Sequence, residues 1–245
     1  IWMMPVTGGE PKQLSDQHGI GFSFHPVVAG GDVFVSGKRD FVRVTLPEGA
    51  VKKLGLALPE DPEEVVADDH AIYVTLFKRD EVMAIPLGAS AKPLFTFRRG
   101  VLAVHGSTLY AVSYATGVLV AIPTSGGKPT TIAKGFVRPT ALAADDTAAF
   151  IYTEKDRTLR RVELATGATS VLAGDLDNSD DLVSDGAWLY TVSWPNQLVR
   201  IAKDGSARDV IAGDLKSPTH IAIDADFLYV VSRDQNKIVR LPKRK

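Results

Sequence analysis

Apolar residues occur along the chain in short, strand-sized runs that alternate with polar residues and end at turn-forming pairs. Alternation with a period of two predicts β-strands that bury one face. The Gly-Gly, Asp-Gly and Thr-Gly pairs between the runs predict tight turns. No stretch shows the 3.6-residue period of an amphipathic helix. The pattern therefore predicts an all-β protein.

The same strand–turn–strand unit recurs six times, with an aromatic residue near the start of its second strand. The shared turn position, spaced 37 to 40 residues apart, is held by Gly30, Asp68, His105, Asp145, Asp185 and Asp224. A second series of turns, one in each unit, is marked by Gly8, Gly49, Gly88, Gly126, Gly167 and Gly205. Two hairpins in a unit of about 40 residues are typical of a four-stranded β-propeller blade.

The two ends of the chain predict how the ring closes. The N-terminus matches a third and fourth strand, and the C-terminus matches a first, second and third, so Ile1–Val6 and Lys237–Pro242 both fit the third place. We predict a six-bladed propeller of four-stranded antiparallel blades, whose last blade is closed by strands from both termini and leaves no open edge. A fragment of a seven-bladed propeller is the alternative. The single domain spans residues 1–245, with blades over approximately 24–58, 63–97, 100–135, 139–174, 179–213, and 218–243 with 1–16.

Composition excludes several classes of protein. The 28 Lys and Arg residues against 29 Asp and Glu residues give a net charge of −1, so nucleic acid is not expected as a partner. No run approaches the length of a transmembrane segment. Because cysteine is absent, disulfides, a thiolate nucleophile and a cysteine-bound zinc are excluded. Isoleucine at position 1 favours a removed leader or a trimmed chain.

Two stretches carry a resemblance to a known group: PTALAADDTAAFIYT from Pro139 and PTHIAIDADFLYVVS from Pro218. They resemble six-bladed propellers of the NHL, YWTD and TolB-like kind, especially the short repeats of secreted bacterial proteins. The resemblance implies a secreted, periplasmic or cell-surface location. Such propellers include binding modules, scaffolds, lyases and lactonases, so the resemblance implies no single function.

A functional site is expected at one mouth of the central channel. We call this side the top face: it is formed by the loops that lead into the innermost strands and by the loops between second and third strands. The acidic residues predicted there are Glu63, Glu64, Asp180 and Asp181. Their oxygens could hold one divalent cation of the Ca or Mg class, together with His25 or His220. Alternatively, the acids face water or pair with Arg99 and Arg138.

Aromatic and charged residues on the same face predict a surface that binds a partner. The candidates are Phe24, His25, Arg98, Arg99, Arg138, Trp194 and His220. Tryptophan and arginine are enriched in binding hot spots. The loops of the first three blades are rich in lysine and arginine, and the approach to the fifth is rich in aspartate, which predicts a dipolar face.

Motifs of nucleophilic catalysis are absent from the sequence. There is no Gly-x-Ser-x-Gly elbow, and the Ser or Thr that ends the second strand recurs in every blade, which favours a structural role. We therefore expect a non-catalytic binding or scaffold propeller without a cofactor, which engages a protein, peptide or glycan through its top face. The alternative is a metal-dependent hydrolase of the lactonase type, with its site at the channel mouth. A lyase using His220 with an acid is a third hypothesis.

Overall fold

The computed structural model describes residues 2–3, 10–13, 26–46, 49–76, 78–179 and 181–243. Within these ranges every regular element is a β-strand, except for the short 3-10 helix η1 (Arg233–Gln235). No helix in the described part of the chain is long and apolar enough to cross a membrane. The prediction of an all-β, six-bladed propeller is confirmed.

The strands form antiparallel sheets in chain order. The first three blades are β3 (Pro26–Ala29), β4 (Asp32–Gly37), β5 (Asp40–Val44) and β6 (Val51–Lys53); β7 (Pro62–Ala67), β8 (Ala71–Leu76), β9 (Glu81–Pro86) and β10 (Lys92–Thr96); and β11 (Gly100–His105), β12 (Thr108–Ser113), β13 (Val118–Pro123) and β14 (Thr130–Lys134). The next three are β15 (Pro139–Ala144), β16 (Ala148–Thr153), β17 (Thr158–Glu163) and β18 (Thr169–Ala173); β19 (Leu182–Asp185), β20 (Trp188–Ser193), β21 (Gln197–Ala202) and β22 (Arg208–Ala212); and β23 (Pro218–Ile223), β24 (Phe227–Ser232) and β25 (Lys237–Pro242).

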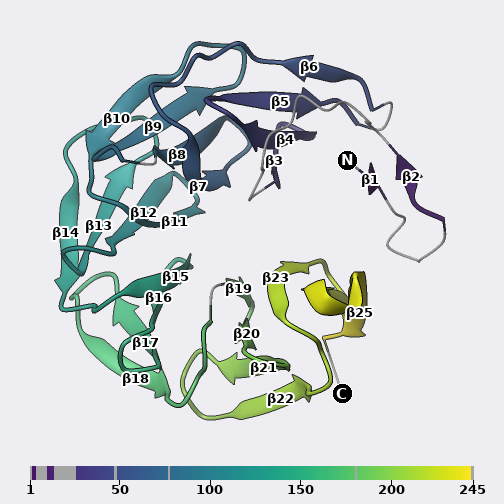
Figure 1. Ribbon diagram of the computed structural model, residues 1–245. Helices are drawn as coiled ribbons and strands as arrows, with labels where there is room; N and C mark the ends of the chain where they lie inside the picture. The colour runs from purple at the N-terminus through teal and green to yellow at the C-terminus, as the bar shows by residue number, and fades with distance from the viewer. Residues whose placement is uncertain are drawn as a thin grey trace.

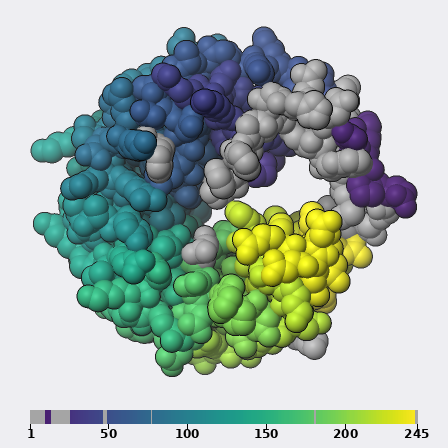
Figure 2. Space-filling model, in the orientation of Figure 1, coloured from purple at the N-terminus to yellow at the C-terminus, as the bar shows by residue number. Residues whose placement is uncertain are grey.

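The blades are arranged as a ring around a central channel (Figure 1). The first strand of each blade lies toward the centre, and the fourth strands β6, β10, β14, β18 and β22 lie at the rim. The innermost strands of successive blades are in contact from β3 round to β23. The space-filling view shows the molecule hollowed at its centre (Figure 2). The first strands thus place their side chains where the blades meet the channel.

The hydrophobic core is divided into layers between neighbouring blades. Between the fourth and fifth blades, Phe150 and Tyr152 of β16 pack with Leu189 of β20 and Val199 of β21, and all four are fully buried. Similar clusters join each of the other successive blades from the first to the sixth. Each blade packs only on its neighbours. The innermost strands lie closest to one another, so small residues such as Ala143 fit between them.

The Ser or Thr at the last or penultimate place of each second strand is buried. The hydroxyl of Ser113 donates to the carbonyl of Arg98 at 2.8 Å, and that of Ser232 donates to the carbonyl of Lys216 at 3.1 Å. The hydroxyl of Ser193 accepts a hydrogen bond from the backbone N–H of Asp177 at 3.0 Å. These bonds tie the loop leading into a blade to that blade's second strand. The structural role expected from their recurrence is confirmed in these three blades.

The last blade is built differently from the closure expected at the chain ends. β25 takes the third place beside β24, and the described residues of this sheet comprise three strands. β1 (Trp2–Met3) pairs with β2 (Lys12–Gln13) as a separate two-stranded sheet, located beside the interval between the sixth and first blades (Figure 1). No pairing of β1 or β2 with β25 is formed in the described ranges. β25 follows β24 after only the η1 turn, so its pairing closes a much shorter loop than pairing of the N-terminal strand would.

Candidate functional site

The channel contains a cavity of about 920 Å³ lined by the innermost strands. Strand pairing fixes which residues are equivalent around it. The residue two places before the turn pairs with an aromatic residue of the second strand in five blades, in the pairs Val66 with Tyr73, Ala103 with Tyr110, Ala143 with Phe150, Val183 with Tyr190, and Ala222 with Tyr229. Four places before the turn, nearer the top face, the six residues are Pro26, Glu64, Val101, Ala141, Asp181 and His220. This ring combines three small or apolar residues with three polar ones.

Glu64 lies on β7 of the second blade, and Asp181 directly precedes β19 of the fifth. Both residues line the channel cavity. Burial, together with the negative charges of Asp181 and Glu63, raises the pKa of Glu64 to about 8. Glu64 keeps some exposed surface because it lines a hollow channel, but the surrounding blades shield its carboxyl group from bulk water. At neutral pH most of this carboxyl group is therefore protonated.

Asp181 is fixed by contacts with two blades. Its Oδ2 atom accepts a hydrogen bond from the backbone N–H of Ile221 on β23 at 2.8 Å. Its backbone carbonyl accepts one from the hydroxyl of Thr191 on β20 at 2.7 Å. His220, the residue before Ile221, also lines the cavity. Asp181 is thereby held facing the channel at the junction of the fifth and sixth blades.

Glu63 has a different partner from Glu64. Its Oε1 atom is 2.7 Å from Nε of Arg99, which begins a row of contacts on the top face. The guanidinium of Arg99 lies 5.7 Å from the centre of the Tyr114 ring. Nε of Arg138 donates to the Tyr114 hydroxyl at 2.8 Å, and Nη2 of Arg138 pairs with Glu154 at 2.8 Å. The row joins the second, third and fourth blades. Of the predicted acids, Glu63 pairs with an arginine, and the partner of Arg138 is Glu154, which was not among them.

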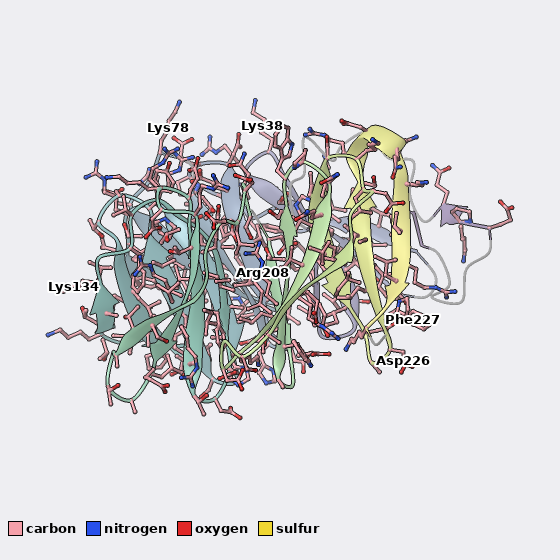
Figure 3. All side chains as sticks on the ribbon, turned by 90° about the horizontal axis from the view of Figure 1, so that it is seen from below. Lys38, Lys78, Lys134, Arg208, Asp226 and Phe227 are labelled. Carbon is pink, nitrogen blue, oxygen red and sulfur yellow. The ribbon has the colours of Figure 1, made fainter. Side chains whose placement is uncertain are left out.

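Trp194 is the most exposed aromatic residue on the described part of the top face, with 54% of its surface accessible. Its backbone N–H donates to the carbonyl of Asp177 at 2.7 Å, which fixes the loop between β20 and β21. Lys38 and Lys78, in the corresponding loops of the first two blades, project from one side of the molecule, and Asp226 lies at the opposite side (Figure 3). Arg98 is exposed, and its carbonyl accepts the Ser113 bond described above.

The metal site stays a prediction. Of its four carboxylates, the structure brings Glu64 and Asp181 together, pairs Glu63 with Arg99, and leaves Asp180 outside the described residues. Phe24 and His25 also lie outside them. Within the described ranges, no group of three or more histidine, aspartate or glutamate side chains is placed to hold a metal ion.

The opposite mouth of the channel has charged pairs that sequence reasoning missed. Nζ of Lys203 is 2.8 Å from Asp145, and Nζ of Lys243 is 2.5 Å from Asp185, each pair joining two successive blades. Burial of Asp145 would raise its pKa, but hydrogen bonds from Lys203, Thr147 and Ala148 outweigh burial and lower it. In each pair the lysine follows its aspartate by 58 residues along the chain, and this repeated spacing can be found in the sequence.

Two solved structures share this architecture over most of the chain. One is nidogen in a nidogen/laminin complex, with 14% identity and a TM-score of 0.69, covering 86% of this chain and 89% of that chain. Another is a catalytically inactive virginiamycin B lyase from Staphylococcus aureus with quinupristin, with 15% identity and a TM-score of 0.79, covering 99% of this chain and 87% of that one. No protein-family model and no curated protein matches the sequence. These likenesses show the fold, a β-propeller.

Proposed function

We propose that this protein is a binding propeller that engages a protein or peptide through its top face. The observation that carries the proposal is Trp194, a large aromatic side chain that is more than half exposed on a loop held by a backbone hydrogen bond. Exposed tryptophan contributes little to folding, but it is among the residues that most often dominate binding energy.

The row formed by Arg99, Tyr114 and Arg138 supports the same proposal. Its side chains are already ordered by ion pairs and by a hydrogen bond, yet the Arg99 and Arg138 side chains are 63% and 51% exposed. Ordered side chains lose less conformational entropy when a partner docks on them. The structural neighbour nidogen is seen in a complex with another protein, laminin, so this fold can serve protein recognition. A glycan is a further partner that the aromatic and charged loops of the top face would suit, and a secreted, periplasmic or cell-surface location belongs to the same proposal and rests on the family resemblance.

Selection from a display library of random peptides tests this function. We expect peptides selected on the wild-type protein to bind Trp194→Ser about 10–100-fold more weakly, because the indole supplies a central contact. Val171→Ser, which alters an exposed valine on the rim strand β18, is the matched control and should bind as wild type does. Selection of no peptide, or peptides that bind both variants equally well, would contradict the proposal.

A metal-dependent hydrolase of the lactonase type is the alternative, and the presence of Glu64 and Asp181 in the lining of one cavity favours it. A calcium or magnesium ion bound there would polarise a substrate carbonyl or activate water. Calcium takes six to eight oxygen ligands, more than these two carboxyl groups supply. Calorimetric titration with both ions separates the alternatives, since stoichiometric binding that is lost in Asp181→Asn would support the hydrolase.

A further inference from the structure

The polar residues of the channel ring are not needed to build a blade. At the position four places before the turn, the first, third and fourth blades have Pro26, Val101 and Ala141, and they form the same type of sheet as the second blade. Glu64 at this position places a carboxyl group among other acids, where burial without a partner is unfavourable. The fold does not require a carboxyl group here, and burying its charged form is unfavourable. A residue of this kind is a candidate for ligand binding.

The carboxyl group of Glu64 has no hydrogen-bond donor among the described residues. The backbone N–H of Glu64 donates to the Thr75 hydroxyl at 3.0 Å, so the main chain is fixed in the sheet while the side chain extends into the cavity. Two arginines of the top face are engaged with other acids, Arg99 with Glu63 and Arg138 with Glu154. Buried polar groups in proteins are nearly always hydrogen-bonded, so this carboxyl group is suited to a donor from outside the chain.

The surroundings of Glu64 favour a small organic cation over a metal ion. Two carboxyl-bearing residues that line the same cavity, Glu64 and Asp181, offer acceptors for the three N–H donors of a primary ammonium group, which needs fewer ligands than calcium does. The next ring of equivalent positions along the channel is lined by apolar side chains, among them Val28, Val66 and Val183. Methylene groups adjoining an ammonium group would pack against these valines, as lysine side chains do on apolar surfaces.

We propose that the channel mouth binds a primary alkylammonium group, such as the side chain of a lysine on the partner, between the carboxyl groups of Glu64 and Asp181. The inference rests on the proposed binding function and specifies what the partner inserts into the channel. The titratable groups that line the cavity beside the ammonium are Glu64, Asp181 and His220, and the charge of the adjacent Glu63 acts on Glu64. Because Glu64 is mostly protonated in the free protein near neutral pH, the entering cation displaces a proton from it.

The test is calorimetric titration of the intact protein with n-butylammonium chloride and with Nα-acetyl-lysine methylamide at pH 7. We expect wild-type dissociation constants of about 1–10 mM, as for a small ligand held by few contacts. Repeating the titration in two buffers of different ionisation enthalpy measures the proton release, which should approach one per ammonium bound. Glu64→Gln should weaken binding at least about tenfold and abolish proton release, since an amide carries neither charge nor titratable proton.

Glu163→Gln is the matched control, because Glu163 ends β17 and is paired with Arg161. It should bind as wild type does. Equal binding by wild type and Glu64→Gln, or no binding of either probe, would overturn the inference. So would Glu64-dependent binding of calcium or magnesium without binding of the ammonium probes. Peptide binding that depends on Trp194 but not on Glu64 would overturn only this inference, whereas ammonium binding without selected peptides would overturn only the proposed function.

Discussion

Replacing Tyr152 with alanine should lower the free energy of unfolding by about 3–5 kcal/mol, the largest effect expected from a single substitution in this chain. Tyr152 is fully buried between the fourth and fifth blades, among Leu159, Leu182 and Leu189. Its hydroxyl donates to the backbone carbonyl of Leu176 at 2.7 Å. The alanine variant loses the apolar contacts of the ring, leaves a cavity between two blades, and leaves that carbonyl without its donor.

Tyr152→Phe separates the two contributions, because it keeps the ring and removes the hydroxyl. We expect it to cost about 1–2 kcal/mol, the usual effect of a lost buried hydrogen bond. Urea-induced unfolding followed by fluorescence measures both variants against wild type. If the alanine variant lost less than about 1 kcal/mol, the layer between these blades would not be packed as described.

The second large effect is on the pH dependence of stability. The pKa of Glu64 is about 8 in the folded protein and returns to its ordinary value of 4.5 on unfolding. Between these values the folded state holds a proton that the unfolded state has lost, so the free energy of unfolding falls as pH rises. The loss is complete above about pH 8, and below pH 4.5 both states are protonated and Glu64 contributes no pH dependence.

Glu64→Gln removes this titration. At pH 8.5 the variant should be more stable than wild type by about 2–4 kcal/mol, a range reduced from the full linkage value because water in the channel screens the charge. At pH 4 the two proteins should differ much less. Urea unfolding at both pH values measures the difference, and Glu163→Gln again serves as the control. Parallel stability curves for wild type and Glu64→Gln would contradict the buried position of this carboxyl group.

The blades were predictable because their signals are local. Alternating apolar residues and turn pairs define each hairpin within a few residues, and their repetition from Gly30 to Asp224 fixes the number of blades. The recurrence of Ser113, Ser193 and Ser232 at strand ends likewise predicted a structural role without any knowledge of the partner atoms.

The closure of the ring was not predictable in the same way. Ile1–Val6 and Lys237–Pro242 have the same strand pattern, so the sequence alone does not decide which one pairs with β24. That choice depends on the length of chain between the strands, and β25 is next to β24. The residue pattern within a strand does not indicate which distant strand it pairs with.

The site was predicted in part. The channel-mouth positions of Glu64, Asp181 and His220 followed from counting back from the turn, but the separate partners of Glu63 and Glu64 did not. The pairing of β7 with β8 has a register shift between Pro62 and Val65, so the directions of the Glu63 and Glu64 side chains could not be taken from strand alternation. The structure identifies the partner of Glu63 as Arg99.

A carboxyl titration of Glu64 shows directly whether this group is buried in the channel and senses the charge of Asp181. Carbon-13 NMR of protein labelled at glutamate side chains, with the signal assigned by its absence in Glu64→Gln, gives the pKa of this group. We expect a pKa of about 8 in wild type and a lower pKa in Asp181→Asn, where the neighbouring negative charge is removed. A wild-type value near 4.5, unchanged in Asp181→Asn, would contradict it.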